Sequence, residues 1–503
     1  MTERAIPLED STLAETPTPI PAPAAAPDHS RRNSLVINLM LVATFVVFLN
    51  ETIMGVALPR LMEDLRITAS TAQWLSTAFM LTMAVVIPIT GFLIQRFTTR
   101  SIFIAAMSLF SAGTLIAAVA PGFEILLAGR IVQASGTAIM LPLLMTTVMT
   151  LVPPATRGKT MGNISIVMSL APAIGPTVSG LILSVFEWRW IFILVLPIAI
   201  GALVLGGMRV QNVTEPKKTP LDVLSVVLSA FAFGGLIFGL SSIGEAAAGH
   251  VLIAPWIPLT IGGISLVAFV ARQIALQRND RALLDLRTFR SRGFSVSIVL
   301  MIIVMATLFG TIILLPIYMQ DVLLLSPLNT GLMLLPGSLL MGIAGPFIGR
   351  LYDKVGPRPL VVPGAIWVSL VLWSMTMFSE TTPVPLVLAA HIALSLGLAF
   401  MFTPLFTSAL GALTPNLYSH GSATIGTVQQ VAGAAGTALF IALMTAGAVA
   451  GASNGQNEVV ALAGGIHTAF FAGAIMSLFA IVAAFFVPRP DPTLAPSGEF
   501  VAH

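Results

Sequence analysis

Residues 34–57 read SLVINLMLVATFVVFLNETIMGVA, and this stretch decides the class of fold. A helix needs about 20 mainly apolar residues to cross the hydrocarbon core of a bilayer. The stretch meets that length and contains a single charged side chain, Glu51. Its apolar residues form one long run and do not alternate with polar ones, as they would in a strand of a membrane barrel. Residues 34–57 are therefore predicted to be a membrane-spanning helix.

The composition of the whole chain supports this prediction. Hydrophobic residues make up 56% of the 503 residues and charged residues 9%, whereas about a quarter of a soluble domain is charged. So few charged residues cannot cover the surface of a soluble protein of this size. We therefore expect lipid to cover most of the surface of this chain. The basic residues are scattered between apolar runs, so we expect no nucleic-acid partner. The chain has no cysteine, which excludes disulfides, thiolate metal sites and thiol nucleophiles.

Similar apolar runs recur along the chain and predict an all-α membrane protein with about fourteen spans. The candidate spans lie near 34–57, 72–93, 101–119, 124–146, 160–184, 189–208, 221–242, 252–274, 294–317, 328–350, 359–378, 385–408, 423–448 and 465–488. An even number of spans places both termini on the same side. Residues 1–33 and 489–503 are predicted to be cytoplasmic tails, the first of them disordered, and no signal peptide precedes the first span.

Lys and Arg residues predict the orientation. With the N-terminus in the cytoplasm, 20 of the 24 basic residues fall in cytoplasmic segments, as the positive-inside rule requires. The exceptions are Arg60, Arg66 and Arg189 on the outer side and Arg130 within a span. An error of one span would destroy this asymmetry, so the asymmetry also supports the number of spans.

Two short basic loops suggest that the chain contains two related halves. The sequence GFLIQRFTTR at 91–100 follows the second span, and GRLYDKVGPR at 349–358 follows the tenth. If spans 1–6 and 9–14 form two bundles, at 34–208 and 294–488, each loop joins the second and third helix of its bundle. A linker at 209–293 then supplies two additional helices between the bundles. Paired halves with a site at their interface are typical of alternating-access carriers, although any protein with many spans has basic cytoplasmic loops.

Glu51 and Arg130 are predicted to lie within spans at similar depth, because the first and fourth spans run in opposite directions. Charges inside a bilayer are costly, face the protein interior and usually mark a transport path. Burial favours the neutral form of a carboxyl group and a nearby arginine favours its charged form. The two residues are therefore a candidate switchable pair for proton coupling. A static ion pair, or a Glu51 hydrated at the surface, would also account for them.

Small and kinking residues mark the fifth span. Proline removes a backbone hydrogen bond from a helix, and small residues let a second helix approach closely. The run 169–180 is therefore a candidate hinge or seal between the bundles, or an ordinary packing surface. Other polar residues in spans are candidates to line a cavity or to bridge helices, and these are Asn50, Gln133, Gln429 and Gln430. His391 is a candidate proton relay, with a neutral packing role favoured.

The sequence suggests no nucleotide or metal as the energy source. Gly158-Lys159-Thr160 resembles the end of a phosphate-binding loop, but Pro153 stands where that loop requires glycine. No soluble segment is long enough for an ATPase, and neither a metal-ligand cluster nor a nucleophile–base pair is evident. We therefore expect a secondary carrier and not an enzyme, without a cofactor and driven by the proton motive force. One charge moving through 100 mV supplies about 2.3 kcal/mol.

Together these motifs resemble the major facilitator superfamily, in its fourteen-helix drug:proton antiporter branch (the EmrB/QacA type, similar to lincomycin and multidrug resistance exporters). The resemblance covers nearly the whole chain from residue 35 and implies two six-helix bundles with two additional helices. Residues 50–59 resemble the first-helix motif, whose usual acid stands where this chain has Asn50. Arg130 and Gly136 match the fourth-helix motif, whose arginine is implicated in proton handling, and residues 188–192 match a recurrent start of the sixth helix.

The resemblance also implies a conformational motif in the two basic loops and the fifth span. In the first loop Gln95 and Thr98 replace the usual Asp and Gly, so the second loop is the better candidate for a charged latch. The implied residues are Gly91, Arg96, Arg100, Gly349, Asp353, Lys354, Gly356 and Arg358, together with Pro172, Gly175, Pro176 and Gly180 of the antiporter motif.

The sequence therefore predicts a proton-coupled antiporter of a bacterial plasma membrane that exports small amphipathic drugs or toxic compounds. Glu51 is expected to bind and release the proton, and Arg130 to change its affinity for the proton. The expected partners are the substrate, protons and the lipid bilayer, and we expect a monomer. Two alternatives stay open: a dedicated exporter of one metabolite or self-made antibiotic, and a non-transporting membrane sensor or assembly partner.

Overall fold

The computed structural model describes residues 30–212, 216, 220–247 and 253–489. The described residues contain fourteen helical segments long and apolar enough to cross a membrane, and no strand. The predicted number of spans and the all-α class are confirmed. The predictions for residues 1–29 and 490–503 and for Lys217 and Lys218 lie outside the described residues. The helix α1 already begins at Ser30, inside the tail predicted for residues 1–33.

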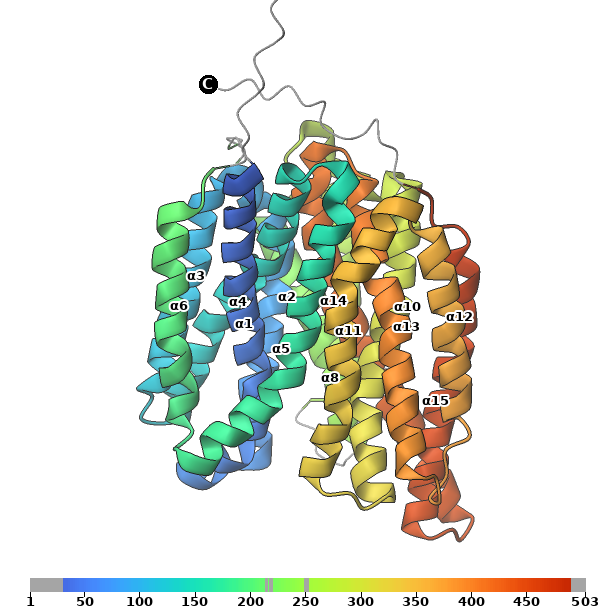
Figure 1. Ribbon diagram of the computed structural model, residues 1–503. Helices are drawn as coiled ribbons and strands as arrows, with labels where there is room; N and C mark the ends of the chain where they lie inside the picture. The colour runs from blue at the N-terminus through green and yellow to red at the C-terminus, as the bar shows by residue number, and fades with distance from the viewer. Residues whose placement is uncertain (1–29, 213–215, 217–219, 248–252, 490–503) are drawn as a thin grey trace, which may run out of the picture.

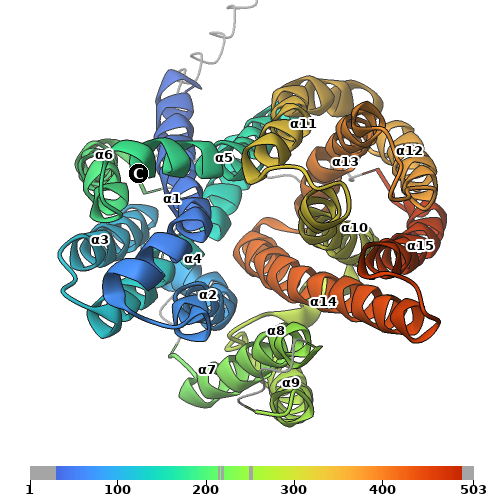
Figure 2. The same ribbon diagram turned by 90° about the horizontal axis from the view of Figure 1, so that it is seen from below.

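The first six spans form one bundle (Figures 1 and 2). Prolines lie inside most of these helices, as is common in membrane spans, where neighbouring groups compensate for the missing hydrogen bond. The helices are α1 (Ser30–Leu65), α2 (Ala69–Arg96), α3 (Thr99–Ala118), α4 (Phe123–Leu151), α5 (Arg157–Val185) and α6 (Arg189–Arg209).

The last six spans form a second bundle beside the first (Figure 2). They are α10 (Arg292–Ile317), α11 (Pro327–Val355), α12 (Arg358–Met375), α13 (Val384–Gly411), α14 (Tyr418–Ser453) and α15 (Glu458–Ala484). Most described helices are longer than the predicted apolar runs. The span predicted at 423–448, for example, covers only the middle of α14. Helical hydrogen bonding continues beyond the hydrocarbon layer, where polar residues are tolerated, so apolar length underestimates helix length.

Two additional spans lie outside the bundles. One consists of α7 (Val223–Ser229) and α8 (Gly235–Ala247), joined by a π-helical turn at Ala230–Gly234, and the other is α9 (Trp256–Leu276). Figure 2 shows them against α2 of the first bundle and α14 of the second. Buried side chains of α2, α9 and α14 and of the π-helical turn belong to one apolar cluster. The additional spans thus cover the junction of α2 and α14.

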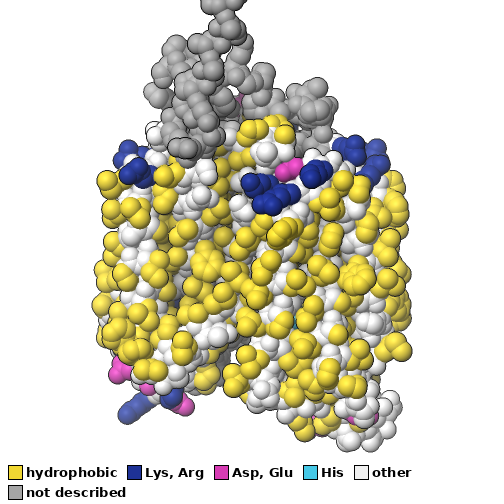
Figure 3. All heavy atoms as spheres, in the orientation of Figure 1, with side chains coloured by type: hydrophobic (Ala, Val, Ile, Leu, Met, Phe, Trp, Pro, Cys, Tyr) yellow, Lys and Arg dark blue, Asp and Glu magenta, His cyan; other side chains and the backbone are white. Residues whose placement is uncertain are grey.

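Lys and Arg gather at one end of the molecule, above a broad apolar belt (Figure 3). This end, here called the basic end, includes Arg96, Arg209 and Arg350. The opposite end includes Arg60 and Arg189. The asymmetry is that of the positive-inside rule, which predicts that the basic end faces the cytoplasm.

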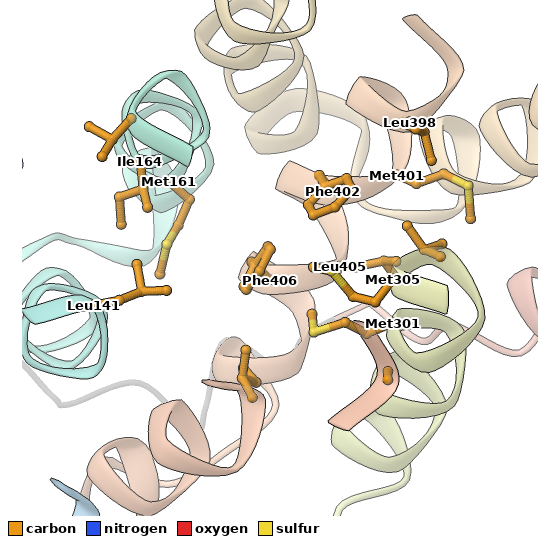
Figure 4. Packing of buried hydrophobic residues seen from close by; sticks show 14 of the residues in the cluster. Leu141, Met161, Ile164, Met301, Met305, Leu398, Met401, Phe402, Leu405 and Phe406 are labelled. Atoms are coloured by element: carbon orange, nitrogen blue, oxygen red, sulfur yellow. The ribbon is translucent and has the colours of Figure 1, made fainter. Parts of the chain in front are cut away.

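One large apolar cluster extends across both bundles. It includes Leu141 of α4 and Met161 of α5 from the first bundle, and Phe402 and Phe406 of α13 from the second. In Figure 4, Leu141 and Met161 lie beside each other, opposite Phe406 of the second bundle. Inside a membrane, helices associate mainly through packing of this kind, because lipid is as apolar as the side chains. The two bundles are therefore in direct side-chain contact in this conformation.

Candidate functional site

Three consecutive polar side chains of α1 point in three directions, because each residue of a helix turns by about 100°. Asn50 is buried and contacts Arg130 of α4. Thr52 faces α5, where its hydroxyl donates to the carbonyl of Ala171 at 3.4 Å. Glu51 lies between these two directions and is half-buried. The helix therefore separates the amide, the acid and the hydroxyl.

Glu51 lies on the side of α1 that faces away from lipid. Val42, nine residues earlier and therefore about 180° around the helix, is 55% exposed on the outer surface. Gly55, one turn after Glu51 on nearly the same face, has open space where a Cβ would lie. Within the described part of the chain, the Glu51 carboxylate has no ion-pair or hydrogen-bond partner. It is thus an unpaired acid at the interior side of a spanning helix.

Arg130 is 1% exposed and is held by two amides. Its Nη1 donates to Gln133 Oε1 at 2.6 Å and to Asn50 Oδ1 at 3.3 Å. Gln133 in turn donates to the hydroxyl of Thr114 at 2.8 Å. The guanidinium lies 4.1 Å from the ring centre of Phe79, within range of a cation–π interaction. The arginine is therefore anchored by neutral groups in the centre of the first bundle.

These contacts revise two expectations. Glu51 and Arg130 interact electrostatically, but their charged atoms are not within ion-pair distance, because Asn50 occupies the position beside the guanidinium. Asn50 and Gln133 are 1% and 0% exposed, so they bind Arg130 and do not line an open cavity. Gln429 and Gln430 of α14 are half-buried, and their role in lining a cavity stays a prediction.

The basic ends of α5 and α11 meet in a close contact, here called the α5–α11 seam. A Cβ on Gly349 would overlap the carbonyl oxygen of Gly158, and a Cβ on Gly162 would overlap that of Gly345. Glycine is required at these positions because the two backbones touch. The seam joins the two bundles, since α5 belongs to the first and α11 to the second.

Asp353 of α11 caps the first turn of α5 across this seam. Its two carboxylate oxygens accept hydrogen bonds from the backbone N–H groups of Gly158, at 2.7 Å, and Lys159, at 2.9 Å. The first N–H groups of a helix lack partners within the helix and carry partial positive charge, so a carboxylate stabilises them. The acid of the second loop therefore holds the bundles together at the basic end.

The comparisons with known proteins agree with this architecture. The pattern of the Major Facilitator Superfamily matches residues 40–437. The chain belongs to this superfamily of transporters. Lincomycin resistance protein LmrB of Listeria monocytogenes is 40% identical over 90% of this chain and 96% of its own length. The Multidrug resistance protein B homolog of Mycobacterium tuberculosis is 30% identical over 86% of this chain and 82% of its own.

A solved structure shows the same fold at low sequence identity. The proton:xylose symporter XylE superposes with a TM-score of 0.63 and 14% identity, covering 92% of this chain and 98% of its own. The chain thus has the superfamily fold, with two six-helix bundles and two additional spans, and it is a membrane transporter of the drug-exporter branch.

The first basic loop of the transporter makes different contacts from the second. Gly91 of α2 lies against α14, where a Cβ would be 3.1 Å from His420 Nδ1. Gln95, which stands where the family has an acid, donates from Nε2 to the carbonyl of Asn416 at 2.9 Å. Arg96 is half-buried and Arg100 is exposed. At the basic end of α2, a hydrogen bond between the neutral side chain of Gln95 and a backbone carbonyl therefore stands where an acidic side chain would form a charged contact.

The antiporter motif of α5 packs within the first bundle. A Cβ on Gly175 would overlap the Thr52 hydroxyl, and the Ser179 hydroxyl donates to the carbonyl of Ile53 at 3.0 Å. Gly180 has open space around it. In this conformation the close backbone contact between the bundles is therefore formed by Gly158 and Gly162, near the start of α5, and only Ser169 of the run 169–180 lies against a glycine of α11, Gly342.

Further polar contacts between the transporter's bundles also lie toward the basic end. The hydroxyl of Thr146 in α4 bonds Ser422 of α14, and that of Ser165 in α5 bonds Thr403 of α13, each at 2.7 Å. Toward the opposite end the ribbons of α5 and α11 diverge, and the surface is hollowed between the bundles (Figures 1 and 3). The conformation is thus closed at the basic end.

Arg157 is a structural residue that the sequence did not single out. It is 5% exposed, and its guanidinium donates to the carbonyls of Met149 and Val152, at 2.9 and 3.1 Å, at the end of α4. It also lies over the ring of Tyr418 in the second bundle, 5.6 Å from the centre. In the sequence, Arg157 stands in a basic loop, where it could not be distinguished from a solvent-exposed arginine.

His391 binds the carbonyl of Leu334 at 3.0 Å, a contact that connects α13 to α11.

Proposed function

We propose that the transporter is a proton-coupled antiporter that exports small amphipathic compounds across the bacterial plasma membrane. The names of its relatives refer to lincomycin and multidrug resistance, which supports export of drug-like molecules. The basic end faces the cytoplasm in this proposal, with both termini on that side, as the distribution of Lys and Arg favours. The chain acts as a monomer, since its own two bundles supply both sides of the path.

The placement of Glu51 carries the proposal. Among the described residues, Glu51 is a carboxylate that lies within the apolar part of a span, faces the interior and has no ion-pair partner. A lone carboxylate in such a site is costly when charged and far less so when protonated, so it favours proton uptake. Asn50 keeps Arg130 in place whatever the charge of Glu51, because an amide does not titrate.

The two bundles supply the alternation of access. Asp353 and the glycines of the α5–α11 seam close the basic end. Glu51 lies in the second half of α1, toward the opposite end, and α5 and α11 diverge at that end (Figure 1). In this state Glu51 exchanges protons with the outside. When the seam opens, the released proton enters the cytoplasm, and an amphipathic substrate then binds from that side. Protonation and substrate binding thus favour opposite conformations, which is the requirement for exchange.

The test compares Glu51→Gln with Glu63→Gln in proteoliposomes. Glu63 is a matched control at the end of the same helix, where its side chain is 71% exposed. Ethidium and lincomycin serve as probes, with an imposed pH gradient. We expect Glu51→Gln to abolish gradient-driven uptake and substrate-induced proton movement, while Glu63→Gln retains both. Gradient-driven transport at the wild-type rate in Glu51→Gln would refute the role of Glu51.

A further inference from the structure

The middle of the connection between α9 and α10 is buried, which is unusual for a loop. Loops normally lie on the surface because their backbone polar groups need water. Here Leu283, Leu284 and Asp285 are 1%, 4% and 4% exposed, and Thr288 is fully buried. We call residues 280–291 the strap. A connection that merely linked two helices would not need to bury apolar side chains.

Gln273 of α9 satisfies the backbone of the strap. Its Oε1 accepts hydrogen bonds from the N–H groups of Leu283, at 2.8 Å, and Leu284, at 3.3 Å. Its Nε2 donates to the hydroxyl of Ser225 in α7 at 2.7 Å. Gln273 is itself 0% exposed. A single buried amide therefore connects the strap to both additional spans.

An ion pair fixes α7 to α9 beside this amide. Asp222, which caps α7, accepts hydrogen bonds from Arg272 Nη2 at 2.6 Å and from Nε at 2.7 Å. These bonds from Arg272 hold the pKa of Asp222 well below its usual range, so the pair stays charged at physiological pH. The additional spans and the strap thus form one connected unit.

The two acids of the strap are paired within it. Asp285 accepts hydrogen bonds from the backbone N–H of Arg287, at 2.9 Å, and from its guanidinium, which also binds Asp280. Burial acts to raise the pKa of Asp285, but the bonds from Arg287 outweigh it and the net shift is downward. With its acid compensated, the strap can place two leucines in an apolar site.

That apolar site lies at the junction of the two bundles. Leu283 and Leu284 belong to one buried cluster with Phe92 of α2 and Ala423 of α14. The same region holds α2 against α14, because Gly91 packs against Ala423 and Gln95 bonds the carbonyl of Asn416. At the C-terminal end of the strap, the Ser291 hydroxyl donates to the carbonyl of Ala412 in the second bundle, at 2.9 Å. The strap therefore contacts both bundles where their basic ends meet.

We propose that the strap, held by the two additional spans, is a second latch that stabilises closure of the basic end at the α2–α14 junction. It acts on the side of the molecule away from the α5–α11 seam, where Asp353 is the first latch. Opening the basic end separates α2 from α14 and so removes Leu283 and Leu284 from their shared cluster. The proposal rests on the alternating-access cycle given above, but not on the identity of the substrate or of the coupling ion.

The test measures the distance between the basic ends of α2 and α14 by electron spin resonance. The chain has no cysteine, so Phe97→Cys and Thr414→Cys, both exposed, provide the only two sites for spin labels. Leu283→Ala and Gln273→Ala are introduced separately. We expect each variant to raise the ratio of molecules with separated α2 and α14 ends to molecules with closed ends by at least about tenfold. Leu283→Ala removes a large buried side chain, and Gln273→Ala removes a hydrogen-bond partner shared by the strap and α7. Val267→Ala, on a 72% exposed position of α9, is the matched control and leaves the ratio unchanged.

The measurement needs neither a substrate nor a proton gradient, so its outcome is independent of the transport assay for Glu51. The milder Leu283→Val shortens the side chain by one carbon and is used if the alanine variants do not purify as folded protein. An increase in separated molecules with this variant, smaller than that expected for alanine, supports the latch. Distance distributions identical to wild type in the folded strap variants would overturn it.

Discussion

At the scale of single residues, the sequence identified the charges but not their partners. Glu51 and Arg130 stand out because charges within spans are costly. Whether they touch depends on a rotation of about 100° per residue, which no apolar pattern reveals. Asn50 occupies the place beside the guanidinium, and Arg157 caps the end of α4 from what looked like a solvated loop. Which groups these charged side chains contact depends on how the helices pack, so it could not be predicted from the sequence.

Asn50→Ala is predicted to destabilise the first bundle. The substitution removes one of the two amide acceptors of a buried guanidinium, which costs about 1–3 kcal/mol when nothing replaces it. We expect a lower thermal unfolding temperature of the detergent-solubilised protein. Asn38→Ala, on an exposed position of the same helix, is the control and leaves that temperature unchanged. Equal unfolding temperatures for the two variants would show that Asn50 is not an anchor of Arg130.

At the scale of helices, small residues indicated close packing but not which helix approaches. The sequence pointed to residues 169–180 of α5 as the seal between bundles. The structure places Gly175 against α1, and the closest backbone contacts of α5 with α11 are those of Gly158 and Gly162. A helix can have small residues on two faces, each suited to a different neighbour. Only the arrangement of the bundles distinguishes the two faces.

Gly162→Ala is predicted to disturb closure of the basic end, whereas Gly180→Ala is not. A methyl group at residue 162 would overlap the carbonyl of Gly345, which forces the backbones of α5 and α11 apart, while residue 180 has open space. We expect ethidium export from reconstituted vesicles to fall about tenfold for Gly162→Ala. Overpacking typically costs about 1–3 kcal/mol, and about 1.4 kcal/mol corresponds to a factor of ten. Similar export by both variants would contradict the assignment of the seal to the start of α5.

At the scale of the whole molecule, the number of spans and the paired bundles followed from apolar length and from the alternation of basic loops. Each span is a local property of about 20 residues, so no tertiary information was needed. The position of the additional spans over α2 and α14 was not predictable, because these spans carry apolar side chains on their buried and exposed faces alike. The buried strap was also missed, since Leu283 and Leu284 stand among charged residues in a connection that reads as solvated.

The conformation of the whole molecule predicts which positions are open to each side of the membrane. Gly55 lies one turn beyond Glu51 toward the opposite end, is exposed, and has open space around it. Ser165 of α5 lies near the basic end, is 7% exposed and bonds Thr403 of the second bundle. In this cysteine-free chain we expect Gly55→Cys to react with a membrane-impermeant maleimide added outside intact cells, and Ser165→Cys to stay unlabelled. Reaction of Gly55→Cys only in inverted vesicles would reverse the assigned orientation, and equal protection of both residues would show that the bundles do not part on the side of Glu51.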